Sequence, residues 1–136
     1  MPAVGITSYM ANLWLNWVRG SSTTPPTTVY AQLHVGVPGA TAASNLSAGT
    51  VGGTVRVAIT FAAASGGSIS ITGTAPSWTC SASAVSETLS HVSFFDASSG
   101  GNCLWTAALN STRTWSTGDT YTLSTDSLNL TPLAAN

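Results

Sequence analysis

The chain has 136 residues, and only 5% of them are charged, against roughly 25% in an ordinary soluble domain. Three scattered arginines, no lysine and a net charge of −1 cannot form the basic stripe that binds phosphate backbones, so we expect no nucleic-acid partner. No apolar run approaches the roughly 18 residues of a membrane-spanning helix, and the first residues lack a basic segment followed by an apolar one, so we expect neither a membrane partner nor a signal peptide.

An amphipathic helix is predicted near the N-terminus, over about residues 7–19. Apolar residues recur there at spacings of three and four, as they do on one face of an α-helix. Thr7 or Ser8 can cap its start, and Gly20 stands where a glycine commonly ends a helix. We expect the apolar face to pack on a sheet, with a partner-docking face as the alternative. The face consists of Met10, Leu13, Trp14, Trp17 and Val18.

After a polar, proline-containing connector at residues 21–28, the apolar period changes from 3.6 to 2, which predicts β-strands. The two clearest strands are 29–35 and 55–61. We expect their apolar faces to meet in one core, capped by Trp14 and Trp17. The glycine-rich residues 98–102 predict a hairpin connection. Further strands are predicted at 69–71, 77–83, 88–95, 102–109 and 120–130.

One helix followed by roughly six to eight short strands predicts a mainly β fold. The expected architecture is a single-domain antiparallel β-sandwich over residues 1–136 with one N-terminal amphipathic helix. The chain is long enough to bury a core, and it contains neither an internal repeat nor a visible domain boundary.

The two cysteines, Cys80 and Cys103, are interpreted as small buried free thiols, with a disulfide across a sheet as the alternative. Their spacing is not that of a metal-binding pair. Asp96 and Asp119 precede turn residues and are interpreted as turn formers that bond nearby backbone N–H groups, rather than as calcium ligands. We therefore expect no metal and no cofactor.

The ionisable residues are too few for most active sites. His34 and His91 are the only candidates for a general base near neutral pH. The sequence contains no G-x-S-x-G elbow and no glycine-rich phosphate-binding motif. We interpret both histidines as hydrogen-bonded structural residues, and we expect His34 to point outward or toward a neighbouring subunit. The chain is accordingly expected to be no enzyme, with no catalytic residues.

Four residues are candidates for an interface: Arg56, Val37, Pro38 and Trp115. Arg56 lies in mid-strand on the polar face, where it could pair with an acid across the sheet or across a subunit boundary. Trp115 lies in the polar stretch 110–118, predicted as a loop, and is the tryptophan expected to be exposed. Exposed tryptophans can stack on sugars, so a carbohydrate-binding module is one alternative function.

Three stretches follow the predicted helix in a distinctive order. They are residues 30–39 (YAQLHVGVPG), residues 91–97 with 100–105 (HVSFFDA and GGNCLW), and residues 118–123 (GDTYTL). Together they resemble a family of small structural proteins of tailed bacteriophages, especially those of actinobacteria. Members are labelled tail-fibre-like, minor capsid or head decoration proteins. The resemblance covers roughly residues 7–131; Val35 and Val37 stand where the family commonly has a threonine and an acid.

The resemblance implies a virion structural protein without catalytic residues, and the scarcity of charge agrees with it. A chain with so little charge repulsion suits a fixed place among identical neighbours. We expect a capsid decoration (cement) protein on the outer head surface, bound to the major capsid protein as a homotrimer and assembled in the cytoplasm of the bacterial host. The alternatives are a tail-fibre or tail-tip component that contacts the host surface, or a carbohydrate-binding module.

Overall fold

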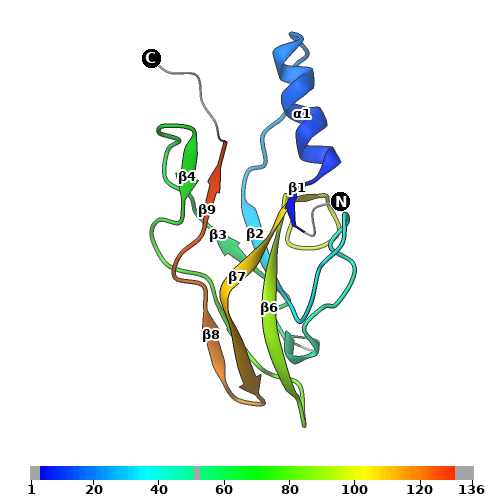
Figure 1. Ribbon diagram of the computed structural model, residues 1–136, viewed down its shortest axis with the longest axis vertical. Helices are drawn as coiled ribbons and strands as arrows, with labels where there is room; N and C mark the ends of the chain where they lie inside the picture. The colour runs from blue at the N-terminus through cyan, green and yellow to red at the C-terminus, as the bar shows by residue number, and fades with distance from the viewer. Residues whose placement is uncertain (1–3, 51–52, 131–136) are drawn as a thin grey trace.

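A computed structural model describes residues 4–50 and 53–130 and shows a mainly β architecture with one α-helix (Figure 1). The largest element is a five-stranded antiparallel sheet with the strand order β1-β7-β6-β2-β3. Two antiparallel ladders, β4–β9 and β5–β8, accompany it. The strands are β1 (Gly5–Ile6), β2 (Val29–His34), β3 (Arg56–Ile59), β4 (Ser68–Ser70), β5 (Ser77–Thr79), β6 (Ser86–Phe95), β7 (Cys103–Ser116), β8 (Thr120–Thr122) and β9 (Ser127–Asn129).

The main core lies between the five-stranded sheet and the two ladders. Leu33 of β2 and Phe94 of β6 are fully buried and belong to one cluster with Trp78 of β5 and with Leu123, which follows β8. Ile59 of β3 is buried in the same cluster, as its alternation predicted. Two layers with apolar side chains between them agree with the predicted β-sandwich.

The polar face of β2 is also buried, contrary to expectation. The chain turns back after β2, and Ser47 donates its backbone N–H to the carbonyl of Leu33 (3.1 Å). His34 is completely buried under this segment, so the prediction that it points outward or toward a neighbour is wrong. Val35 and Val55, which were expected in the core, are 36% and 37% exposed because each lies just beyond the end of its strand.

Strand β7 is much longer than predicted. Residues 110–116, expected as a loop, continue pairing with β6, as shown by Thr88 opposite Thr114. Threonine favours strands, and pairs of threonine with threonine or serine stabilise neighbouring strands, although the polarity of this stretch resembles that of a loop. The predicted hairpin between β6 and β7 is confirmed: Asp96 accepts a hydrogen bond from the backbone N–H of Asn102 (2.7 Å).

The predicted strand 120–130 is divided into β8 and β9, which pair with different partners. The chain crosses from the β5 ladder to the β4 ladder at residues 123–126. Strand β1, which was not predicted, adds only two residues to the edge of the large sheet.

Cys80 and Cys103 are both free and buried, which confirms their interpretation as buried free thiols rather than as a disulfide.

Helix α1 (Ser8–Val18) is attached to the sheet at its first turn and then extends away from it (Figure 1). Thr7 caps the helix by accepting the N–H of Met10 (3.3 Å), and its hydroxyl donates to the carbonyl of Cys103 (2.6 Å). Trp17 is 69% exposed and Trp14 is only half-buried, so the prediction that they cap the core is wrong.

The short helix η1 (Ala48–Thr50) contacts β5 and β6. No helix in residues 4–50 or 53–130 has the length and apolarity to cross a membrane.

Candidate functional site

The outer end of α1 is the most exposed apolar surface of the described chain. Leu15, Trp17 and Val18 are 65%, 69% and 74% exposed. The helix contains no charged residue, and the adjoining Arg19 is held by a hydrogen bond from its Nε to Asn16 (2.9 Å). Clustered exposed apolar side chains of this size mark interaction surfaces in soluble proteins. The alternative prediction of a partner-docking face therefore fits α1 better than packing on the sheet.

The candidate interface residues Val37 and Pro38 are adjacent but differ in exposure. Val37 is an exposed side chain, whereas Pro38 is buried. Asn45 donates its side-chain N–H to the carbonyl of Val37 (2.8 Å), which holds the loop after β2 in shape. Only Val37 of this pair offers an apolar side chain to a partner.

Arg56 makes its contacts inside the chain rather than with an acid. Its Nε donates to Gln32 (2.9 Å), and Nη1 donates to the carbonyls of Ala97 (2.9 Å) and Gly100 (2.6 Å). Its guanidinium carbon lies 3.3 Å from the centre of the Phe95 ring. Arg56 thus ties β3 to the β6–β7 hairpin, and partial burial lowers its pKa.

Replacement of Arg56 by lysine should lower the free energy of unfolding by about 1–2 kcal/mol, because an ammonium group cannot reproduce the planar fork and the ring contact. Urea unfolding measures the change. The matched control is Arg113→Lys, since Arg113 is exposed and makes no side-chain hydrogen bond within the described chain. Equal stabilities for the two variants would contradict the assignment.

Trp115, predicted to be exposed, is 2% exposed and belongs to the core. Its indole N–H donates to Glu87 (2.9 Å), which also accepts bonds from the Ser47 hydroxyl and from the backbone N–H groups of Ala48 and Gly49 (both 3.0 Å). Partial burial opposes ionisation of Glu87, but these hydrogen bonds outweigh it and lower the pKa of the carboxyl. The interface prediction for Trp115 is therefore wrong as regards its exposure, because the long β7 carries this residue into the core.

The Glu87 clamp, meaning Glu87 with Ser47, Ala48, Gly49 and Trp115, was not predicted. Its members come from η1 and the residue before it, from β6 and from β7, and no local sequence pattern relates them. The only available signal was that Glu87 is the one glutamate in a chain with four acidic residues. The clamp fastens η1 to the sheet.

Both histidines have hydrogen-bond partners, as predicted. His34 has Nδ1 at 2.9 Å from the carbonyl of Ser44 and Nε2 at 2.7 Å from the Ser93 hydroxyl. Burial lowers the pKa of His34, which favours the neutral ring. His91 bonds the Ser90 hydroxyl (2.8 Å). Within the described ranges, no three His, Cys, Asp or Glu residues gather in a way that could hold a metal ion.

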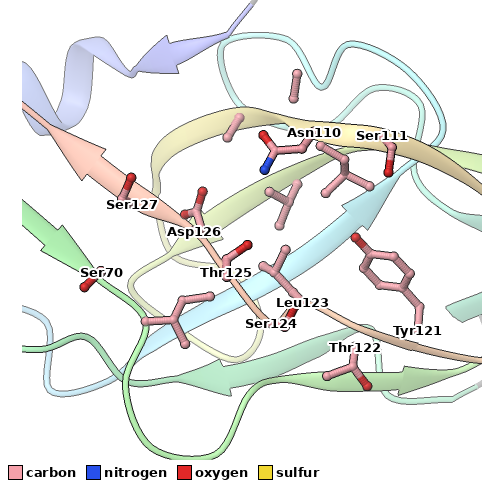
Figure 2. A pocket seen from close by; sticks show the side chains of 15 residues that line it. Ser70, Asn110, Ser111, Tyr121, Thr122, Leu123, Ser124, Thr125, Asp126 and Ser127 are labelled. Carbon is pink, nitrogen blue, oxygen red and sulfur yellow. The ribbon is translucent and has the colours of Figure 1, made fainter.

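A groove of about 740 Å³ lies between β7 and the chain that crosses from β8 to β9 (Figure 2). Asn110 and Ser111 lie on its β7 side, while Tyr121 and Asp126 project from the opposite side. Its size falls within the range of small-molecule sites, roughly 300–1,000 Å³. The sequence analysis did not predict this site, because the groove depends on how β7 and the crossing chain are placed.

Comparison with known proteins identifies one family. A family model described as "Podophage GP4 fiber I protein gp80" matches residues 5–131, which is nearly the whole chain. No curated protein sequence matches the chain. The match confirms the expected kinship with phage virion structural proteins, while a specific kinship with actinobacterial phages or with decoration proteins does not follow from it. The protein therefore belongs to the podophage GP4 fiber I protein gp80 family and is a structural component of a phage virion.

Proposed function

We propose that this protein is a non-enzymatic component of a virion fibre and that its copies associate through the outer end of α1 into a closed homo-oligomer, expected to be a trimer. The association is supported by the exposed apolar side chains at the outer end of α1, a helix without charged residues. Placement in a fibre rather than on the head is favoured because the description of the matching family is that of a fibre protein. Decoration, with the major capsid protein as the partner, is the competing placement.

Other copies of this chain are the occupants that best suit the face. Symmetric association brings the same residues together. Helix α1 itself carries no charge, and Arg19, which follows it, is hydrogen-bonded to Asn16. A tryptophan such as Trp17 can bury on the order of 150–250 Å² in an interface. After its first turn, α1 extends away from the five-stranded sheet, so its outer end is free of that sheet (Figure 1).

The isolated protein should therefore be oligomeric in light scattering, and the double variant Trp17→Ser with Val18→Ser should be monomeric. Exposed helix residues contribute little to the fold of the monomer, so the variant should retain its circular dichroism spectrum. The matched control is Val37→Ser, which removes an exposed apolar side chain from the loop after β2 and should leave the oligomer intact. A monomeric wild-type protein, or dissociation by Val37→Ser alone, would contradict assembly through α1.

Position in the virion separates the two placements. A reconstruction of the particle should contain density for this chain in a fibre, with a copy number far below that of the shell protein. Density on the head surface at hundreds of copies would overturn the fibre placement and would favour decoration instead.

A further inference from the structure

Residues 36–46, called the strap below, lead from the end of β2 toward the short helix η1. Two backbone hydrogen bonds join this part of the chain to β2 and the residue after it. The N–H of Val35 donates to the carbonyl of Asn45 (2.8 Å). The N–H of Ser47 donates to the carbonyl of Leu33 (3.1 Å). The other backbone hydrogen bonds of the strap within the described chain connect its own residues, so the strap is attached to the sheet at few places.

The middle of the strap is pressed against the sheet by a strained residue. Ala42 is buried and packs with Phe95 of β6 and Cys103 of β7 in a small cluster apart from the main core. Its φ is +53°, in the left-handed region that residues other than glycine rarely adopt. Asn45 has the same φ, which asparagine tolerates better than alanine does. The contacts beneath the strap must therefore offset the strain at Ala42, and their loss favours release.

His34 lies under the strap and is hydrogen-bonded at both ring nitrogens. Nδ1 faces the carbonyl of Ser44, which can only accept, so Nδ1 carries the hydrogen of the neutral ring. Nε2 then accepts from the hydroxyl of Ser93, which is fully buried, as is the ring. A second proton, on Nε2, would face the hydroxyl hydrogen of Ser93. That side chain has no other hydrogen-bond partner among the described residues, so the arrangement is complete only for a neutral ring.

The surroundings of His34 offer nothing that would stabilise a positive charge. The strap contains no ionisable residue, and no acidic side chain bonds His34 within the described chain. His91 lies opposite it on β6, and Arg56 of β3 is a second basic neighbour. The thiol of Cys103 on β7 stays neutral, because burial raises its pKa to about 11. Burial lowers the pKa of His34, and His91 and Arg56 add to this shift, while the bond to Ser44 opposes it.

The Glu87 clamp, which follows the strap, is fastened by different chemistry. Hydrogen bonds lower the pKa of Glu87, so the carboxylate remains ionised in mild acid. The backbone of Gly49 lies directly on the thiol of Cys80, since a Cβ at this glycine would be 2.8 Å from Sγ. Each free cysteine is thus covered by a different part of the chain, Cys103 by the strap and Cys80 by the clamp. The two thiols can report separately on the two parts.

From this arrangement we infer that the strap is a pH-sensitive device: protonation of His34 in mild acid releases residues 36–46 from the sheet, while the Glu87 clamp and the strands stay in place. Strand β2 is paired on both sides, so movement of the strap is the route by which a charged ring reaches water. The inference goes beyond the proposed fibre role and does not depend on the position of the protein in the virion.

The pH range follows from the direction of the shift. The closed strap binds the proton less readily than the open chain, in which histidine has its ordinary pKa of 6.5. The closed state is therefore most stable above about pH 6.5 and weakens as the pH falls from there toward the pKa of the covered ring. Uptake of one proton raises the open fraction by at most about tenfold per pH unit. The pKa values of Glu87 and Asp96 are lowered from 4.5 and 3.8, so neither carboxyl takes part in mild acid.

Thiol labelling of the full-length protein tests the inference. Dithiodipyridine is applied between about pH 7.5 and about pH 5, and mass spectrometry of peptides distinguishes the two cysteines. Each rate is divided by the rate of the urea-unfolded chain at the same pH, which removes the pH dependence of the thiol chemistry itself. The relative rate of Cys103 should rise by up to about tenfold per pH unit below about pH 6.5, while that of Cys80 stays low. No rise for Cys103, or an equal rise for both thiols, would overturn the inference.

Variants identify the group that takes up the proton. His34→Gln keeps a donor for the carbonyl of Ser44 and an acceptor for the hydroxyl of Ser93, but it cannot titrate. The protection of Cys103 should then be the same throughout this pH range. The matched control is His91→Gln, since His91 bonds the Ser90 hydroxyl and not the strap, and this variant should keep the rise. A rise that persists in His34→Gln, or that disappears in His91→Gln, would contradict the role given to His34.

The protonation of His34 is also measured directly in the wild type, so the inference stays testable if His34→Gln does not fold. Nitrogen–proton NMR spectra of the ring should show the hydrogen on Nδ1 above about pH 6.5 and a doubly protonated ring at lower pH. The conversion should occur over the same pH range as the exposure of Cys103. A ring that stays neutral while Cys103 reacts, or that titrates while Cys103 stays protected, would remove the link between His34 and the strap.

Discussion

Replacement of Leu33 by alanine should lower the free energy of unfolding by about 2–5 kcal/mol. Leu33 is completely buried in the interior strand β2, between the neighbours β3 and β6, so the truncation leaves a cavity that the paired strands cannot close. The loss combines the removed apolar contacts with the cost of that cavity. Urea denaturation followed by tryptophan fluorescence measures it.

The matched control is Val35→Ala, two residues further along the chain. Val35 follows the same alternation as Leu33, but it lies beyond β2 and is partly exposed, so its loss should be below about 0.5 kcal/mol. A loss below about 0.5 kcal/mol for Leu33→Ala itself would mean that the assigned core face of β2 is inverted.

The elements with a strong local pattern could be predicted from the sequence. The helix was expected over about 7–19 and is found at Ser8–Val18, because both its apolar period and the cap at Thr7 are encoded within a few residues. Strand β2 was expected at 29–35 and ends one residue earlier. The hairpin at 98–102 depends on adjacent glycines with positive φ and on Asp96, which also lie close together in sequence.

The apolar or polar pattern of a helix or strand does not show which segment will cover that face in the fold. The apolar stripe of α1 indicates that some surface will cover it, but not whether that surface belongs to the same chain. The polar face of β2 resembled a solvated face, yet the segment after β2 folds back over it and supplies Ser44 to His34. In both cases the outcome depends on contacts between distant segments.

The candidate groove shows the same limit. Asn110 and Asp126 resemble ordinary loop residues, and nothing between them in the sequence indicates that they share a site. Their proximity follows from the register shift in β7 and from the division of the predicted last strand into β8 and β9. A pattern of period 2 cannot foretell such a shift, because extra residues in one strand change the partner rather than the composition.

Replacement of Glu87 by glutamine should lower the free energy of unfolding at neutral pH by about 1.5–3 kcal/mol, the range for hydrogen bonds to a charged group. The carboxylate accepts bonds from four donors, including the indole of Trp115, and the amide of glutamine presents an N–H group to some of them. Asp119→Asn is the control, because Asp119 is exposed and accepts a single backbone N–H; its loss should be smaller. Equal losses would argue against a special role for the clamp.

The clamp also predicts how stability depends on pH. The folded state lowers the pKa of Glu87 below its ordinary value of 4.5, so the unfolded chain binds the proton more readily. The stabilisation is therefore complete above about pH 4.5 and is lost as the pH falls through the folded pKa. Asp96 acts in the same direction and Asp126 in the opposite one, so the wild-type curve alone does not isolate Glu87. The difference in unfolding free energy between the wild type and Glu87→Gln does isolate it, and this difference should shrink steadily on acidification below pH 4.5. A difference that stays constant down to the acid limit of folding would show that the charge of Glu87 contributes nothing, and that the loss at neutral pH comes only from the amide N–H group of glutamine facing other donors.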